Sequence, residues 1–574
     1  MMRNPWRWSI GLAVSLSVVV FVLMIPIAES QEPTPVRPKL VVMIVFDQMR
    51  GDYLKKWQPL FGEGGFKRLQ NDGAWFTDCH YPYAYTLTAA GHTSLSTGTT
   101  PSVHGIIAND WWDRAHGEPV SSVTPPPDER TKGVGPYRRK AETVGDVLIR
   151  MLTGRVVSLS IKDRAAILMA ALRANACYWF SSQTGDFTTS PYYCDDPHPW
   201  VTKFNKTKFA DQWLDKTWDR FDAKLDYAKH SGPDDFITEG TGFLQGQTFP
   251  HAFKLAQTKD VKKNKQNYYD AVTCSPMGNE LLLHFAKAAI VNEKLGQTEK
   301  VDLLCVSFSS NDLVGHTWGP DSQEVLDITL RSDALIKDLL GFLDAKVGKG
   351  KYYFALSADH GVCPLPEFAK RDGKIAERIE PELLISLAED FLNKKFLKEG
   401  EKAPWLEQPK KGNPWVYFNY ATLKELKLKN EVVETALAKW YEVQPGIQQA
   451  FTRTQMMNNE KFKDEPSELF KSVKLSFRPD CSGDVMVIVK PYHQFSPPTL
   501  SKNPEKWTTY RTTHGTPHPY DTHVPLLVMG PRIQPGVRGE RVAPQAMASI
   551  LSEALGVARP KEAAYPVPEG LFKK

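Results

Sequence analysis

Aspartate and histidine residues recur beside short apolar runs of this sequence. In open α/β sheets, functional side chains gather beyond the carboxyl ends of the strands, so residues in such places can meet at one edge. A single aspartate after a strand is usually a helix cap or turn residue, but recurrence at the same end of successive runs indicates a metal site. The residues are Asp47 after Leu40–Phe46, Asp312 and His316 after Leu303–Phe308, Asp359 and His360 after Tyr352–Leu356, and His514, His518 and His523 before or against Val524–Met529.

The ligand types predict the kind of metal. Mixed oxygen and nitrogen ligands suit borderline divalent cations, Zn²⁺ first, although Mn²⁺ or iron also binds such sets. Three aspartates and three histidines exceed one tetrahedral site, so the sequence predicts two metals. Two metals about 4 Å apart can hold the attacking and leaving oxygens of an in-line displacement.

The segment Tyr85–His92 supplies a candidate nucleophile. Thr88 precedes small residues that could open a helix, whose free amides would favour a phosphoryl group. A threonine hydroxyl is a poor nucleophile until a base or a metal removes its proton. Without the metal residues, Thr88 would be interpreted as a helix N-cap alone.

The apolar runs themselves predict the elements that position these residues. Runs such as Leu40–Phe46 and Val156–Ile161 are continuous and rich in β-branched residues, as is typical of strands buried on both faces of a parallel sheet. Helical spacing in Leu281–Val291 and from Val325 to Phe342 places helices between them. We therefore predict an α/β fold with a mostly parallel central sheet flanked by helices.

Two regions break the alternation of strands and helices. Residues from about 195 to 270 have no clear period, and residues from about 380 to 480 carry helical patterns and a Lys-rich loop. We interpret both as insertions that cap the sheet. Residues 39–574 are then one catalytic domain with two insertions, which could form a lid or a specificity wall.

The N-terminus predicts export. Basic residues, an apolar run from about Ile10 to Ile27 and the small residues Ala28 and Ser30 describe a secretory signal over residues 1–30, followed by a Pro-rich linker over 31–38. The run is long enough that an uncleaved membrane anchor is the alternative. In either case the body of the protein lies outside the cytoplasm, in the periplasm or secreted.

Composition excludes several classes of protein. With 574 residues, 42 prolines, 38 glycines and a net charge of +5, the chain is neither collagen-like nor of low complexity, and it has no basic tract for nucleic acid. Its seven cysteines are scattered. Cys177 and Cys194 are the first pair to consider for a disulfide, whereas Cys305 lies in an apolar run and is expected to be a small buried residue.

Longer blocks around these residues carry a family resemblance. The chain resembles the alkaline phosphatase superfamily, and within it the phosphate-irrepressible bacterial alkaline phosphatases, zinc phosphomonoesterases with a threonine nucleophile that are related to type I phosphodiesterase/nucleotide pyrophosphatases. The blocks are LVVMIVFDQMRGDYL (Leu40–Leu54), GGFKRL (Gly64–Leu69), TLTAAGHTSLSTGTTPSVHGIIANDWWD (Thr86–Asp113), SLSIKDRAAIL (Ser158–Leu168), SSNDLVGHTWGPDS (Ser309–Ser322), LSADHG (Leu356–Gly361) and TTHGTPHPYDTHVPLLVMG (Thr512–Gly530).

The resemblance implies a role for each site residue. Asn109 would donate a hydrogen bond to a phosphoryl oxygen, and Lys162 and Arg164 would bind the other phosphoryl oxygens. His514 matches the ligand position better than His518 or His523. One zinc would be held by Asp47, Asp359, His360 and the Thr88 oxygen, and the other by Asp312, His316 and His514.

The Lys-x-Arg pair favours phosphate monoesters as substrates. A monoester dianion carries charge on three free oxygens, which an ammonium and a forked guanidinium match. A nucleotide pyrophosphatase/phosphodiesterase is the main alternative, because it shares the metal ligands and the threonine. A sulfatase is disfavoured because Cys274–Gly278 lacks the arginine of the sulfatase motif, and a catalytically silent zinc-binding envelope protein because the nucleophile is intact.

Overall fold

The computed structural model describes residues 38–127, 133–152, 154–407, 413–458, 467–496 and 510–573. Residues 38–574 form one compact unit. The predicted signal over 1–30 and all of the linker except Pro38 lie outside the described residues. Within the described residues, no helix combines the length and apolar character needed to cross a membrane.

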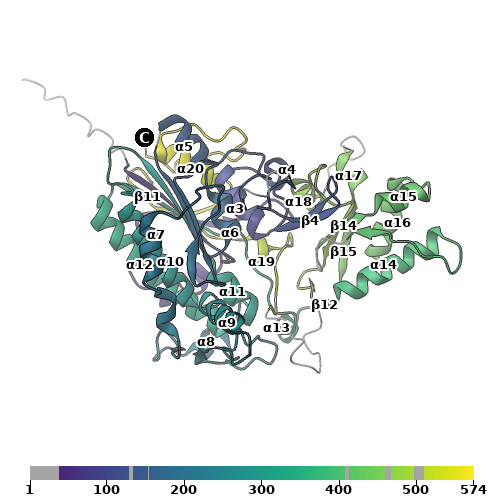
Figure 1. The fold of residues 1–574 in the computed structure, drawn as a ribbon, viewed down its shortest axis with the longest axis horizontal. Helices are drawn as coiled ribbons and strands as arrows, with labels where there is room; N and C mark the ends of the chain where they lie inside the picture. Colours follow the sequence, from purple (N-terminus) through teal and green to yellow (C-terminus); the bar gives the residue numbers. More distant parts are fainter. Residues whose placement is uncertain are drawn as a thin grey trace, which may run out of the picture. The chain divides into compact units, whose positions relative to one another are not determined.

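A nine-stranded sheet forms the centre of this unit (Figure 1). Its middle strand is β1 (Leu40–Phe46), with β10 (Asp302–Phe308) and β11 (Tyr352–Ser357) parallel to it on either side. The order is β19-β2-β18-β11-β1-β10-β5-β6-β7, and the outer strands are β2 (Ala74–Cys79), β5 (Val156–Ser160), β6 (Ala176–Ser181), β7 (Asp186–Thr188), β18 (Leu526–Met529) and β19 (Gly536–Val542).

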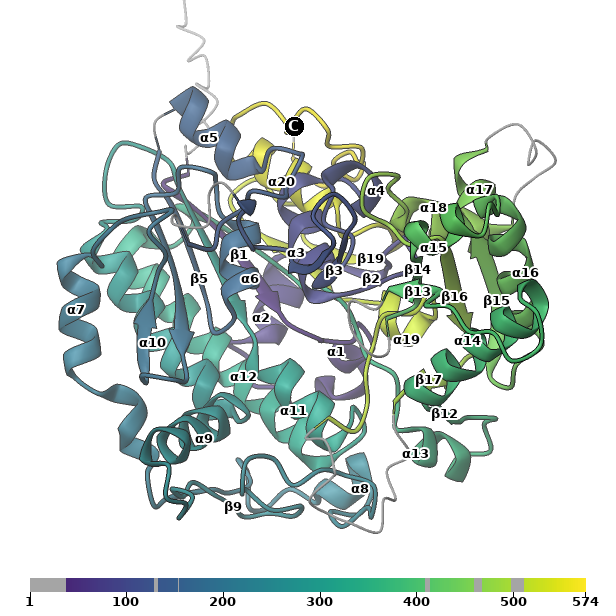
Figure 2. The ribbon, with the colours of Figure 1, turned by 45° about the vertical axis from the view of Figure 1, so that its right-hand side comes forward.

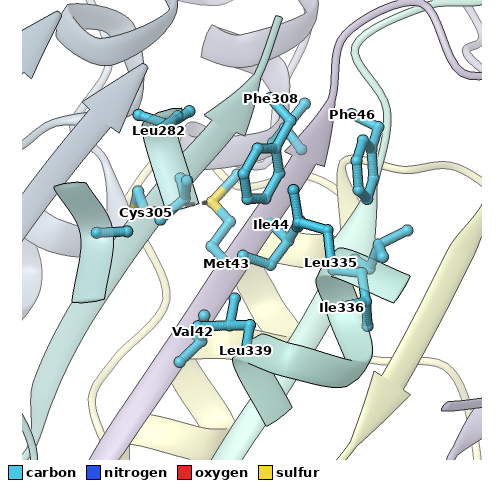
Figure 3. Packing of buried hydrophobic residues seen from close by; sticks show 14 of the residues in the cluster. Val42, Met43, Ile44, Phe46, Leu282, Cys305, Phe308, Leu335, Ile336 and Leu339 are labelled. Carbon is cyan, nitrogen blue, oxygen red and sulfur yellow. Dashed lines mark hydrogen bonds between the residues drawn. The ribbon is translucent and has the colours of Figure 1, made fainter. Parts of the chain in front are cut away.

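Helices cover both faces of the sheet, which explains the continuous apolar strands. All seven residues of β1 are buried. The helices α10 (Pro276–Asn292) and α12 (Gln323–Leu343) lie on one side, and α3 (Thr88–Thr97), α6 (Asp163–Met169) and α20 (Ala546–Leu555) on the other (Figures 1 and 2). Figure 3 shows part of this core, in which Val42 and Ile44 of β1 belong to one cluster with Leu339 of α12. Each buried aliphatic side chain of this kind contributes about 1.5–3 kcal/mol.

The predicted architecture is confirmed, with one refinement. Both predicted helices are present as α10 and α12, and the five apolar runs all contain strands of the central sheet. The run that ends at Met529 forms β18, which is antiparallel to β11 and to β2. The sheet is therefore mostly parallel but mixed on this side.

The second break in the alternation contains a sheet of its own. Strands β13 (Leu406–Glu407), β14 (Trp415–Phe418), β16 (Val485–Val489) and β15 (Ile447–Thr452) pair in that order, with α14 (Pro381–Phe396) and α16 (Asn430–Glu442) beside them (Figure 2). Strand β16 lies beyond the expected boundary near residue 480. The sheet joins the main body through an apolar cluster that includes Tyr85 and Tyr417, and through an ion pair between Arg114 and Asp484 at 2.6 Å.

The segment from 195 to 270 contains only short elements and the first part of one longer helix. They are α7 (Pro199–Lys206), a 3₁₀ helix η3 (Phe209–Trp213), α8 (Tyr227–Ser231), the paired strands β8 (Thr217–Trp218) and β9 (His251–Ala252), and the start of α9 (Val261–Thr273). Such short pieces leave no periodicity in the sequence.

The suggested Cys177–Cys194 disulfide is wrong, because all seven cysteines have free thiols. Cys177 and Tyr178 are successive residues of β6, so their side chains point to opposite faces. Cys194 lies beside Tyr178, with its sulfur 3.9 Å from the tyrosine hydroxyl. Cys305 is fully buried beside Met43, as expected.

Candidate active site

The predicted metal ligands lie where three neighbouring parallel strands end. Asp47 follows β1, and its backbone N–H donates to the carbonyl of Phe308, the last residue of β10. The helix α11 (Ser310–Trp318) begins directly after β10, and its Asp312 and His316 are four residues apart on one face. Parallel neighbours end at one edge, so residues distant in sequence meet there.

Asp47, Asp359 and His360 form the first ligand set, with their ligand atoms all within 4.8 Å of one another. The Nε2 atom of His360 lies 3.6 Å from Asp47 Oδ1 and 3.3 Å from Asp359 Oδ2. Both of these carboxylate oxygens are buried, and neither has a hydrogen-bond partner among the residues that the structure describes. Burial and the charge of Asp359 raise the pKa of Asp47 well above its ordinary value. Each carboxylate thus keeps one buried oxygen without a partner among the described residues, and such oxygens fit a bound cation.

Asp312 lies at the centre of the second set. Its Oδ1 is 3.1 Å from His316 Nε2 and 3.7 Å from His514 Nε2. The ligand atoms of Asp312, His360 and His514 all lie within 4.8 Å of one another, and the rings of His360 and His514 are stacked 3.5 Å apart. The two sets therefore adjoin each other across one pair of stacked imidazoles, and His316 borders the second set.

All three histidines present the same nitrogen to the site. Their Nδ1 atoms donate to backbone carbonyls: His316 to Thr512 at 2.6 Å, His360 to Gly361 at 2.9 Å, and His514 to Thr86 at 2.8 Å. A carbonyl only accepts, so each Nδ1 carries the proton and each Nε2 keeps a free lone pair. Protein histidines that bind metals are held in this way. The donor set fits two zinc ions better than hard cations, because half of its ligands are nitrogen.

Thr88 is the first residue of α3 and lies beside the first ligand set. Its hydroxyl is 3.4 Å from His360 Nε2. The backbone N–H of Ala89 donates to Asn109 Oδ1 at 2.9 Å, which fixes the Asn109 side chain next to this helix end. A Cβ atom on Gly91 would lie 2.2 Å from the Asp359 carbonyl oxygen, so glycine permits the helix to approach the ligand strand this closely.

Lys162 and Arg164 flank the same site from the end of β5. The ammonium of Lys162 is 2.7 Å from Asp47 and 2.5 Å from Asp312, one carboxylate from each set. Burial acts to lower the pKa of Lys162, but Asp312 and Asp47 outweigh it and raise the pKa above its ordinary value. Arg164 lies 3.9 Å from Asp110, and its side chain is a quarter exposed.

A cavity of about 800 Å³ opens onto these residues. Thr88, Asn109, Lys162, Arg164, Asp312, His316 and His514 all line it. The remaining predicted ligands, Asp47, Asp359 and His360, lie at its base and are fully buried. The structure therefore brings all ten predicted site residues to one place, whereas His518 and His523 bond to the carbonyls of Val489 and Thr77 instead.

Sequence reasoning missed two residues that hold the ligands in place. Gln48 donates from its backbone N–H to Asp359 at 3.0 Å and from its amide to Asp312 at 2.7 Å, and its φ of 69° is left-handed. His92 lies 3.2 Å from Asp359 Oδ2 and 2.8 Å from the Ser307 hydroxyl. Only the sequence position of each residue could have indicated its role, since Gln48 directly follows a predicted ligand and His92 lies one helical turn after Thr88.

Comparison with known proteins agrees with this arrangement. The family model of type I phosphodiesterase / nucleotide pyrophosphatase matches residues 41–515. The chain is 32% identical to alkaline phosphatase PhoV of Synechococcus elongatus over 92% of each chain, and 32% identical to alkaline phosphatase PafA of Elizabethkingia meningoseptica over 93% of each.

Solved structures of PafA share the fold. The wild-type crystal structure superposes with a TM-score of 0.83 at 31% identity, covering 93% of this chain and 99% of that chain. A mutant structure of PafA carries substitutions of a threonine, an asparagine, a lysine and an arginine. The chain belongs to the type I phosphodiesterase/nucleotide pyrophosphatase family and is an enzyme of the alkaline phosphatase superfamily.

Proposed function

We propose that the enzyme is a two-zinc alkaline phosphatase that hydrolyses small phosphate monoesters through a covalent phosphothreonine at Thr88. The observation that carries the proposal is the position of Thr88, between a buried set of metal ligands and the cationic pair Lys162 and Arg164 in one cavity. The names of PhoV and PafA support phosphatase activity, and the four residue types substituted in the PafA mutant match Thr88, Asn109, Lys162 and Arg164.

The residues of the chain divide the reaction into two displacements. The Thr88 oxygen attacks phosphorus, and the ester bond to the leaving alcohol or phenol breaks. Water then cleaves the bond between phosphorus and Thr88, which releases inorganic phosphate and restores the hydroxyl. Zinc at the two ligand sets would supply Lewis-acid activation of the attacking and leaving oxygens. Asp47, Asp359 and His360 would hold one ion, and Asp312, His316 and His514 the other.

Cationic and amide donors face the transferred group. Its charge remains on three oxygens in a loose transition state. Lys162 supplies a point charge, Arg164 a fork of N–H donors, and Asn109 a neutral donor whose Oδ1 is already used by Ala89. A phosphodiester has one fewer charged oxygen, so these residues favour monoesters.

We also propose that the chain is exported. The secretory pattern over residues 1–30 supports this. Cleavage after Ser30 would give a periplasmic or secreted enzyme that begins at Gln31, which N-terminal sequencing of the protein recovered from the periplasmic fraction would test. A retained signal would instead leave an N-terminal membrane anchor.

A substrate panel tests the function. Purified enzyme is assayed on an aryl phosphate, a bis-aryl phosphate and an aryl sulfate, before and after treatment with a zinc chelator and after addition of zinc. We expect kcat/KM to be highest for the monoester by about 10- to 100-fold, as the loss of one hydrogen bond to a charged group implies. Activity should disappear with chelator and return with zinc. Preference for the diester would instead assign the enzyme to the phosphodiesterases, and full activity without metal would reject the two-metal site.

A further inference from the structure

A second group of buried polar atoms lies away from the cavity. Six of these atoms, all buried, have no hydrogen-bond partner within the described part of the chain. Buried polar atoms are almost always paired with protein, water or an ion, so such a group requires an explanation. The atoms are Asp234 Oδ1, Thr238 Oγ1, Glu239 Oε2, His251 Nδ1, Trp318 Nε1 and Glu324 Oε2.

Contacts link His251, Glu324 and Trp318, and Thr238 is adjacent in sequence to Glu239. His251 Nε2 is 3.0 Å from Glu324 Oε1, and the rings of His251 and Trp318 are 4.8 Å apart. Glu239 interacts electrostatically with Glu324 and Asp234. The backbone N–H of Gly240, next to Glu239, donates to the Thr317 carbonyl at 2.8 Å. The group therefore lies where the segment after α8 meets the end of α11 and the start of α12.

The charges in this group are mainly negative and deeply buried. Glu239 is 2% exposed and Glu324 is fully buried. Arg220 is paired with Asp234 at 2.8 Å. Burial first, and then Glu324 and Asp234, raise the pKa of Glu239 to about 10. Buried carboxylates without a partner are costly unless they are protonated, paired or bound to a metal.

We propose that Glu239, Glu324 and Thr238 form a structural Ca²⁺ site at the junction of α11 and α12. Two carboxylate oxygens and a hydroxyl oxygen are available, and each belongs to a residue that is at least nine-tenths buried. Oxygen ligands of this kind select hard cations, and Ca²⁺ accepts irregular sets completed by water. His251 Nε2 binds Glu324 Oε1 and leaves Oε2 of that carboxylate for the ion.

The site would act on the active site through α11. This helix carries the ligands Asp312 and His316, and its last turn accepts the hydrogen bond from Gly240. A cation that binds Glu239 and Glu324 would fix the loop that caps the helix. The proposed calcium site is distinct from both sets of predicted zinc ligands, because it shares no residue with them.

Metal content and thermal stability of the whole enzyme test the proposal. Purified wild-type protein, with its zinc retained, is passed through a Ca²⁺-selective chelator and re-equilibrated with ⁴⁵Ca²⁺. We expect one calcium per chain and a rise in Tm of about 3 °C with saturating calcium. Glu239→Gln should lose both effects while its zinc content is unchanged. Glu434→Gln is the matched control, because Glu434 is also buried but its Oε2 accepts from the Thr454 N–H at 2.9 Å.

Two other results would contradict the calcium site, and a second variant covers the case in which Glu239→Gln does not fold. Absence of calcium binding and of a Tm shift in the wild type would mean that water and a proton satisfy the group. A third zinc in place of calcium would reject the choice of ion. If Glu239→Gln does not fold, Thr238→Val takes its place, and calcium binding at wild-type affinity in that variant would reject the ligand set.

Discussion

At the scale of single residues, the proposed preference for monoesters can be tested at Lys162 and Arg164. Lys162 is paired with Asp47 and Asp312, so it can also stabilise the ligand carboxylates, whereas Arg164 faces the cavity with only long contacts to Asp110 and Asp163. We expect Arg164→Ala to lower kcat/KM on an aryl monoester by about 10- to 100-fold, as for a lost hydrogen bond to a charged group. The same variant should change diester hydrolysis by no more than about 3-fold.

Steady-state kinetics on both substrates measure this ratio. Arg173→Ala is the control, since Arg173 is exposed and lies outside the lining of the cavity. Equal losses on monoester and diester would show that Arg164 acts on the fold or on the metals and not on the third charged oxygen. Lys162→Ala should lower activity while metal content is retained, because Asp47 and Asp312 lose a cation that competes with metal for their oxygens.

Thr88 is the proposed nucleophile, and substitution tests the covalent step. Thr88→Ala removes the attacking oxygen, so we expect activity to fall by about 1,000-fold or more, with no phosphorylated peptide after acid quench. Thr88→Ser keeps an oxygen at the same place and should retain most turnover and form phosphoserine. Mass spectrometry of the quenched protein distinguishes these outcomes. A fully active Thr88→Ala together with an inactive Thr86→Val would move the nucleophile to Thr86.

At the scale of elements, Asp521 fixes the loop that carries His514. Its Oδ2 accepts from both the N–H and the hydroxyl of Thr516, at 2.8 and 2.6 Å. Burial raises the pKa of Asp521 to about 7, although these hydrogen bonds act in the opposite direction. The protonated form is thus favoured by folding. The protonated carboxyl therefore adds about 4 kcal/mol to the free energy of unfolding by linkage. This stabilisation is complete below about pH 4 and is lost as the pH rises through about 7.

Asp521→Asn should remove this dependence on pH. The amide keeps an acceptor for Thr516 and has no charge to bury, so the variant should match the wild type at pH 4 and exceed its free energy of unfolding at pH 8. Urea unfolding between these values measures the difference. Asp195→Asn, at an exposed position, is the control. A wild-type pH profile in Asp521→Asn would mean that Asp521 stays ionised in the folded protein.

The elements also show what a sequence can and cannot predict. Strands such as β1 and β10 are continuous apolar runs, so their ends, and hence Asp47 and Asp312, could be placed in advance. The small sheet around β16 could not, because its strands are short and separated by helices. The left-handed turn at Gln48 and the distance between Cys177 and Cys194 follow from tertiary packing, which local patterns do not encode.

At the scale of the whole molecule, stability rests on the core and not on covalent links. All seven cysteines are free, and five of them are buried. Burial raises the pKa of the Cys274 and Cys305 thiols to about 12, so these two remain protonated and unreactive at neutral pH. An exported protein would meet an oxidising compartment in this state, where small domains depend on disulfides. A domain of this size buries enough apolar surface to fold without them.

We therefore expect the Tm of the enzyme to be the same with and without a thiol reductant. Alkylation of the native protein should leave the five buried cysteines unmodified, because their sulfurs are inaccessible and their thiolates are scarce. Alkylation after denaturation without reductant should modify all seven, as counted by intact mass. Cys194→Ser serves as a reference for a partly exposed thiol and should lower that count by one. If denatured wild-type protein instead shows two fewer alkylated cysteines, and its Tm falls on reduction, then two of the thiols form a disulfide in the native enzyme.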